Sequence, residues 1–263
     1  MYFTEEKLRQ IITESEEMIQ KYQNRYNDFK STLDTSGYKI IWTEGIAEPC
    51  YIGYINDIED SPERKIFKSE PKKKEFCAKH YFNDNEPVYS VFLDDKAEAV
   101  MEKFFVRNGN TRSGVRYYGD LSQISTEIFD GDGKPVEYRS IEIKKPINQP
   151  VEITVECFVY AYEDRHIISA EYIRDLNISK PVMMYDDPLY NDWGKDINYM
   201  LKTPPMNPNM TGRYDFIYGE HGSPAELSRT EYSYCNVKTY QFKAKKKTFD
   251  RFVKYGIPWF TKQ

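Results

Sequence analysis

The sequence of 263 residues has few cysteines, few histidines and no long apolar run. Its four cysteines lie far apart and form no C-x-x-C pair, which excludes a zinc ribbon or a thioredoxin-like redox motif. No apolar run approaches the roughly 20 residues of a membrane-spanning helix. The first residues lack the basic and apolar regions of a signal peptide. We therefore expect a cytoplasmic protein with reduced thiols and no membrane contact.

Motifs of the common enzyme classes are also missing. The sequence contains no G-x-S-x-G, no phosphate-binding glycine loop, no H-E-x-x-H and no dinucleotide fingerprint. Cys77 and His80 are near enough in sequence to share a metal, but no second ligand pair follows them. A Cys–His nucleophile would also need a third group to orient its base. We expect no catalytic residues, no metal and no cofactor.

Aromatic and charged residues are plentiful. Aromatics make up 16% of the chain, and charged residues make up 30%, with a net charge of -5. The aromatic content argues against wholesale disorder, and the acidic balance argues against a nucleic-acid partner. A chain of this length can bury one core without disulfide or metal staples, so we interpret residues 1–263 as a single domain.

The N-terminal segment, residues 1–34, predicts a helix. Apolar side chains recur from Leu8 to Leu33 at steps of three and four residues. Thr4 is suited to cap the N-terminus, and Gly37 lies where glycine commonly closes a helix. We expect one helix over residues 4–33 with its apolar stripe packed on a sheet. A partner helix or self-association is the alternative.

Residues 38–175 show the two-residue period of β-strands and repeated strand–turn–strand units. Polar turns such as Asp130 to Gly133 separate the strands, and we interpret this turn as a hairpin rather than a calcium loop. The pattern predicts the α+β class, with an N-terminal helix packed on a large curved antiparallel β-meander. A short strand is expected at 51–55, and a solvated loop at 56–74.

Charged residues alternate with apolar ones along the expected strands. This alternation predicts a sheet with one buried face and one face in water. The charges assigned to the water face are Glu127, Glu137, Arg139, Glu152 and Glu156.

The remaining segments differ from the meander. Residues 181–212 are rich in proline and methionine and are interpreted as an irregular insertion, and residues 213–263 as a final hairpin with a short C-terminal helix. The insertion holds a cluster of acidic and aromatic residues, which we predict to bind a partner through aromatic anchors and charge steering. An acid/base pair and a loop packed into the core are the alternatives. The cluster consists of Tyr185, Asp186, Asp187, Tyr190, Asp192 and Trp193.

The hairpins at residues 81–87 (Tyr-Phe-Asn-Asp-Asn-Glu-Pro) and 129–135 (Phe-Asp-Gly-Asp-Gly-Lys-Pro) resemble the tyrosine-aspartate hairpin repeats of bacterial toxin loci. The leading helix and the acidic, tyrosine-rich sheet are similar in character to immunity proteins of bacterial polymorphic toxin systems. The resemblance covers about residues 75–175. It implies a cytoplasmic protein that blocks a cognate toxin by direct binding, without a cofactor.

We therefore expect a non-enzymatic protein-binding module, of which an immunity-type inhibitor of a bacterial toxin is the leading form. Its partner would be a protein, such as a basic toxin domain. One alternative is a carboxylate-dependent hydrolase acting on a sugar or a phosphodiester. The other is a structural component of a phage or secretion assembly, which would dock through edge strands.

Overall fold

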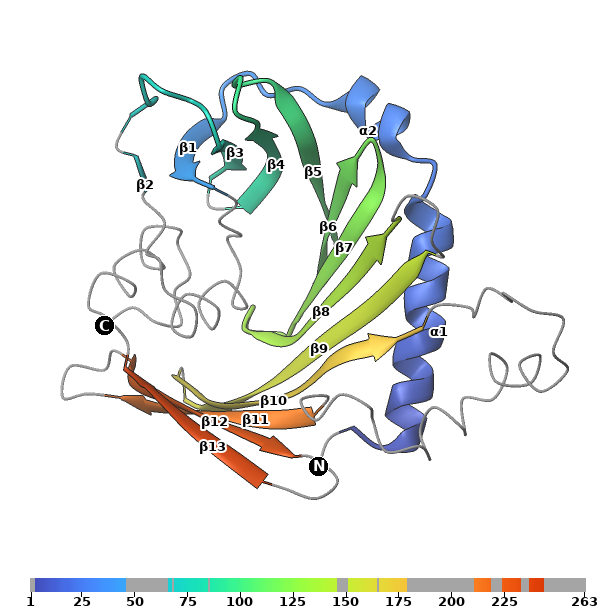
Figure 1. The fold of residues 1–263 in the computed structure, drawn as a ribbon, viewed down its shortest axis with the longest axis vertical. Coiled ribbons are helices and arrows are strands. Elements are labelled where there is room, and N and C mark those ends of the chain that lie inside the picture. The colour runs from blue at the N-terminus through green and yellow to red at the C-terminus, as the bar shows by residue number, and fades with distance from the viewer. Residues whose placement is uncertain are drawn as a thin grey trace, which may run out of the picture.

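In the computed structural model the described residues form two helices and one antiparallel sheet (Figure 1). The structure describes residues 3–45, 66–67, 69–84, 86–145, 151–164, 166–178, 211–218, 224–232 and 237–243. Neither helix in this part of the chain has the length and apolar character needed to cross a membrane. The elements are α1 (Glu5–Tyr22), α2 (Tyr26–Thr32), β1 (Lys39–Glu44), β2 (Ile66–Phe67), β3 (Cys77–Asn83), β4 (Glu86–Leu93), β5 (Ala99–Asn108), β6 (Thr111–Tyr118), β7 (Asp120–Phe129), β8 (Pro135–Lys144), β9 (Glu152–Glu163), β10 (His166–Asn177), β11 (Thr211–Tyr218), β12 (Pro224–Tyr232) and β13 (Val237–Lys243).

The strands of the described residues form one sheet in the order β13-β12-β11-β10-β9-β8-β7-β6-β5-β4-β3-β1-β2. From β3 to β13 each strand pairs with its neighbour in sequence, and β1 lies between β3 and β2. All pairs are antiparallel. The expected α+β class and antiparallel meander are confirmed.

The sheet is strongly curved. In Figure 1, β1–β4 and β11–β13 lie at the two ends of an open curve, and α1 lies outside it. We call the face that contacts α1 the outer face and the opposite face the inner face. Side chains of opposed residues in neighbouring strands share a face, so the strand register assigns each residue to one of the two.

Helix α1 begins where its sequence favours a cap. The Thr4 hydroxyl accepts a hydrogen bond from the backbone N–H of Lys7 at 3.2 Å, which satisfies one of the free donors of the first turn. Ile11 and Ile12 are buried in one apolar cluster with Ile124 of β7 and Ile141 of β8. These contacts join the helix to the outer face of the sheet.

The expected single helix over residues 4–33 is divided into α1 and α2. The carbonyl of Tyr22 accepts hydrogen bonds from the Tyr117 hydroxyl of β6, at 2.7 Å, and from the backbone N–H of Arg25, at 3.1 Å. In an uninterrupted helix this carbonyl would accept from residue 26. The break redirects the chain, and Phe29 of α2 stacks on Phe104 of β5 with ring centroids 5.3 Å apart. Gly37 does not end a helix: α2 ends at Thr32, and Gly37 lies between α2 and β1 with φ +78°.

The turn at Asp130–Gly133 is a hairpin turn, as predicted. The Asp130 carboxylate accepts the backbone N–H groups of Asp132, at 3.0 Å, and Lys134, at 2.8 Å. Gly133 has φ +76°, a conformation that costs glycine little. The carboxylate therefore stabilises the turn between β7 and β8.

Two segments differ from the sequence interpretation. Ile66 and Phe67, placed in a solvated loop, form the short strand β2 and pair with Thr43 and Trp42. The expected insertion ends earlier than residue 212, because β11 already begins at Thr211. The expected strand at 51–55, the rest of the insertion and the C-terminal helix lie outside the described residues.

The prediction of one wet sheet face is wrong for its central strands. Glu127 and Glu137 are each 6% exposed, and Arg139 is 4% exposed. Glu137 and Arg139 lie on the outer face under α1, and Glu127 lies on the inner face. Each is buried together with an opposite charge, which compensates the cost of removing it from water. Of the other two, Glu152 is exposed and Glu156 is half-buried.

Candidate functional site

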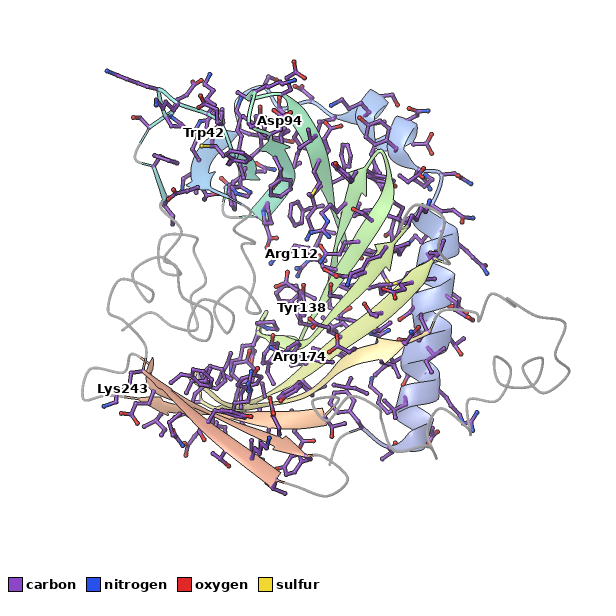
Figure 2. All side chains as sticks on the ribbon, viewed as in Figure 1. Trp42, Asp94, Arg112, Tyr138, Arg174 and Lys243 are labelled. Atoms are coloured by element: carbon purple, nitrogen blue, oxygen red, sulfur yellow. The ribbon has the colours of Figure 1, made fainter. Side chains whose placement is uncertain are left out.

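The inner face of the sheet carries a continuous row of charged and aromatic side chains. Strand register places these residues opposite one another from β5 to β10. Figure 2 shows labelled members of the face on the inside of the curve. The row consists of Arg107, Arg112, Glu127, Tyr138, Phe158 and Tyr172.

Arg112 is the fixed centre of an arginine cluster, which we define as Arg107, Arg112, Phe129, Glu86 and Glu127. Its Nε donates to Glu127 at 2.7 Å, and its Nη1 donates to Glu86 at 2.8 Å. Burial lowers the pKa of Arg112, but the two carboxylates outweigh burial and hold the pKa above its ordinary value. Arg112 is thus a permanent, nearly buried cation.

Arg107 is the exposed arginine of this cluster. Its guanidinium carbon lies 4.2 Å from the centre of the Phe129 ring, and that of Arg112 lies 5.4 Å from the same ring. The Arg107 Nε donates to the carbonyl of Gly109 at 3.0 Å. Like charges opposed across two strands repel, and here the ring and the carboxylates hold them together. A guanidinium fixed in this way is suited to bind a carboxylate through its remaining N–H groups.

An aromatic stack continues the inner face toward β11. Tyr172 packs against Phe158 and Tyr214, with ring centroids 5.7 and 4.9 Å away, and the rings of Phe158 and Tyr214 lie 6.2 Å apart. The guanidinium of Arg174 lies 5.1 to 5.6 Å from the centres of these three rings. A second arginine, Arg229, lies 4.8 Å from the ring of Tyr240. Arginine on aromatic rings therefore recurs along this face.

The one imidazole whose contacts the structure describes, His80, links three strands. Its Nδ1 lies 2.8 Å from the Ser90 hydroxyl, and its Nε2 lies 3.0 Å from that of Thr43. Thr43 donates its proton to the carbonyl of Gly45 at 3.1 Å, so it accepts from Nε2–H, and Ser90 donates to Nδ1. This is a serine–histidine hydrogen bond, but His80 and Ser90 are each 1% exposed. The arrangement ties β1, β3 and β4 together and gives a substrate no access.

The proximity of Cys77 and His80 in sequence does not bring their side chains together. They are three residues apart on β3, and successive side chains of a strand point to opposite faces. Burial raises the pKa of the Cys77 thiol, which opposes formation of a reactive thiolate. Within the described residues, no group of three or more His, Cys, Asp or Glu side chains is placed to hold a metal ion.

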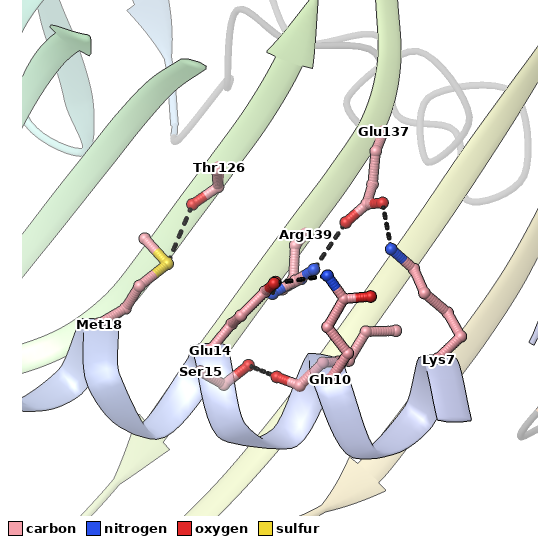
Figure 3. A network of polar contacts seen from close by, with 9 residues as sticks. Lys7, Gln10, Glu14, Ser15, Met18, Thr126, Glu137 and Arg139 are labelled. Carbon is pink, nitrogen blue, oxygen red and sulfur yellow. Dashed lines mark hydrogen bonds and ion pairs between the residues drawn. The ribbon is translucent and has the colours of Figure 1, made fainter. Parts of the chain in front are cut away.

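The outer face holds a polar network between α1 and β8 (Figure 3). Glu137 contacts Lys7 at 3.0 Å and Arg139 at 2.7 Å, and Arg139 also donates to Glu14 at 2.8 Å. Burial raises the pKa of Glu14, but hydrogen bonds from Arg139 and Gln10 outweigh it and lower the pKa overall. The network fixes the position of the helix.

A second carboxylate on the outer face, Glu102 of β5, holds α2. It accepts hydrogen bonds from Tyr26 and Lys30 of α2 and from Tyr89 of β4. Burial raises the pKa of Glu102, but the bonds from Lys30 and the two tyrosines outweigh it, and its pKa lies below 4.5. The hydrogen bond to Glu102 raises the pKa of Tyr26 to about 12. At neutral pH Glu102 is therefore ionised and both tyrosines are protonated.

The predicted partner-binding cluster lies outside the described residues: Tyr185, Asp186, Asp187, Tyr190, Asp192 and Trp193. Sequence reasoning missed the arginine cluster, because its members come from β4, β5, β6 and β7 and meet only when the strands pair. Arg112 and Arg116 are four residues apart on a strand and share a face, but Arg116 is not a member of the cluster, so this spacing does not reveal it.

No protein-family model matches the sequence, and no curated protein matches it.

Proposed function

We propose that this protein is a non-enzymatic protein-binding module that uses the inner face of its curved sheet. The observation that supports this most is the repeated stacking of arginines on aromatic rings along that face, at Phe129, Tyr172 and Tyr240. Arginine is enriched among the residues that dominate binding at protein interfaces. Phe129 and Tyr172 are themselves buried, and they serve to hold the arginines in place. Prior fixation on a ring also reduces the entropy that an arginine loses on binding.

The chemistry of the inner face favours an acidic segment of the partner. The Nε–H of Arg107 donates to the Gly109 carbonyl, and its guanidinium carries about four further N–H donors. Arg112, opposed to it on β6, adds a second positive charge. A carboxylate on the partner would bind Arg107 in the two-point geometry that arginine prefers. Glu86, whose exposed carboxylate is paired with Arg112, would lie at the edge of this contact with the partner.

In its finer form, the proposal is an immunity-type inhibitor that binds and neutralises a bacterial toxin in the cytoplasm. The resemblance of the hairpins at residues 81–87 and 129–135 supports this form. The acidic cluster at 185–193 stays a prediction as a second contact, with Trp193 as its anchor and its aspartates steering a basic patch of the toxin. On this proposal Trp193→Ala weakens partner binding by about 2 kcal/mol or more.

The carboxylate-dependent hydrolase has less support. A general acid needs a pKa raised toward neutrality, whereas the pKa values of Glu14 and Glu102 are lowered by their partners. Glu127 and Glu137 are engaged with arginines at 2.7 Å. Glu127 and Glu137 therefore serve as partners of buried arginines, which is a structural role.

The proposal is tested by purifying the tagged full chain from its native cells and identifying any protein bound in equal amount. That protein is then produced in a susceptible host with and without the chain. We expect growth arrest by the partner alone and recovery when the two are produced together. A bound partner without toxicity would contradict the immunity form and leave the binding module standing. The absence of any bound protein would contradict both.

A further inference from the structure

Among the described strands, β13 lies at one end of the sheet and pairs on one side only, with β12 (Figure 1). Six of its seven residues are exposed, on both faces of the sheet, and Phe242 is half-buried. Its pairing with β12 runs without a bulge, whereas β2, at the other end, has only two residues. Short length and bulges are two of the devices that keep an edge strand from pairing further, and β13 has neither.

The side chains of β13 suit it to pairing on its second side. The strand contains no proline and is rich in β-branched and aromatic residues. Its two charges, Lys238 and Lys243, lie near its ends and leave the centre uncharged. On the outer face, Thr239 and Gln241 hydrogen-bond to hydroxyl groups of β12 at 3.3 and 3.0 Å. The same residue types could form such cross-strand pairs with a further strand.

We propose that β13 pairs with β13 of a second copy of this chain, antiparallel and centred on Tyr240. Centring on Tyr240 is the one antiparallel register that pairs all seven residues of the strand. It opposes Thr239 to Gln241 of the second copy, and Tyr240 to itself. A two-fold interface requires a surface that is complementary to itself, and the sequence of β13 meets this requirement.

The proposed register keeps the lysines of the two copies apart. Lys238 is opposed to Phe242 of the second copy on the inner face. Lys243, whose side chain is 86% exposed, is opposed to Val237, which is 65% exposed. The aliphatic stem of each lysine can therefore cover an apolar side chain while its charge stays in water. In-register parallel pairing would instead oppose each lysine to itself, which is destabilising.

The charges of the neighbouring strand β12 are compatible with this pairing. Glu226 is opposite Lys243, and Glu231 is opposite the other lysine of β13. The remaining charge of β12, Arg229, lies 4.8 Å from the ring of Tyr240. At the usual spacing of strands, the Arg229 residues of the two copies would be about 14 Å apart, with both tyrosines between them.

The first test measures association of the full chain alone, so its result is independent of the proposed function. Two paired strands of this length form a small interface, so we expect a monomer–dimer equilibrium with Kd on the order of 10–100 μM. Sedimentation equilibrium at concentrations up to about 500 μM covers this range. A chain that stays monomeric throughout would overturn the proposal, including the case in which β13 receives a strand of another protein.

The second test changes the charges across the proposed interface. Thr239→Lys combined with Gln241→Lys opposes lysines to lysines, and the corresponding pair of glutamate substitutions opposes glutamates to glutamates. Each double variant alone should raise Kd by about tenfold or more. Their equimolar mixture should restore the dimer, which also shows that both variants are folded. Asn24→Lys with Asn108→Lys adds the same charge at exposed positions elsewhere and should leave Kd unchanged.

The third test determines the register by disulfide formation. Directly opposed residues of antiparallel strands have Cα atoms about 4.5–5.5 Å apart, which is within the range that a disulfide spans. Tyr240→Cys should therefore crosslink two copies under mild oxidation. Lys238→Cys is the matched control, since in this register the two copies of position 238 are about 13 Å apart. The wild type under the same oxidation measures any crosslinking by the native cysteines.

The outcomes of the second and third tests decide the proposal. Recovery of the dimer in the mixture, with a crosslink at 240 and none at 238, would support it. Double variants that dimerise as well as the wild type would overturn it. So would a dimer that crosslinks equally at 238, which indicates parallel strands, or one that does not crosslink at 240, which indicates another interface.

Discussion

Buried charged side chains of this protein lie in groups that contain both positive and negative charges. Arg139 contacts Glu14 and Glu137 on the outer face, and Arg112 contacts Glu127 on the inner face. Removing one member of such a group leaves the other charge buried without a partner, which lowers the free energy of unfolding by several kcal/mol. Alternation of charge along a strand therefore does not identify a wet face when opposite charges lie on the neighbouring strand or helix.

A glycine on the inner face makes room for the aromatic stack. A β-carbon at Gly212 would lie 2.3 Å from the ring of Tyr172 and 2.6 Å from the backbone carbonyl of Thr230. We predict that Gly212→Ala lowers the free energy of unfolding by about 1–3 kcal/mol, because the ring must move. Gly131→Ala is the control, since nothing lies within 4 Å of its site. Urea unfolding of both variants checks this, and equal midpoints would refute the packing described.

At the scale of elements, the hairpins follow from local turn chemistry. Gly133 and the capping carboxylate of Asp130 could be recognised in the sequence, because a turn needs only a few neighbouring residues. The division of the N-terminal helix could not be recognised in the same way. It depends on the hydroxyl of Tyr117, which is 95 residues from the Tyr22 carbonyl that it contacts.

Attachment of α2 to the sheet depends on the charge of Glu102. Because the pKa of Glu102 is lower in the folded than in the unfolded chain, its contribution to stability is present above pH 4.5 and lost as pH falls through the lowered pKa. We predict that Glu102→Gln lowers the free energy of unfolding at about pH 7 by about 1–3 kcal/mol. The variant should then lose less stability than the wild type on further acidification.

Urea unfolding of the wild type and Glu102→Gln between about pH 7 and pH 3 measures this difference. Asp120→Asn is the control, since Asp120 forms an exposed ion pair with Lys145 at 2.9 Å and should contribute little. Parallel stability curves for the wild type and Glu102→Gln would show that Glu102 does not hold α2 through its charge.

For the whole molecule, the fold class and the order of the strands could be predicted from the sequence. Which side chains meet on each face of the sheet could not. Period-two segments joined by short polar turns favour neighbouring antiparallel strands, whatever their side chains contact. The inner-face site needs the curvature and the register together: Arg107, Arg112 and Glu86 come from three strands. Their meeting has no short sequence signature, and so the acidic cluster at 185–193 was the more visible candidate.

The central claim is that the inner face binds a protein partner through its arginines. Calorimetric titration of the co-purified partner with the wild type, Arg107→Ala and Arg25→Ala tests it most directly. Arg25 is the matched control: it is also exposed and lies 5.8 Å from an aromatic ring, that of Phe29, on α2. We predict that Arg107→Ala raises Kd by about tenfold or more, equivalent to about 1.4 kcal/mol, and that Arg25→Ala leaves Kd unchanged. Equal affinities for all three proteins would contradict the account.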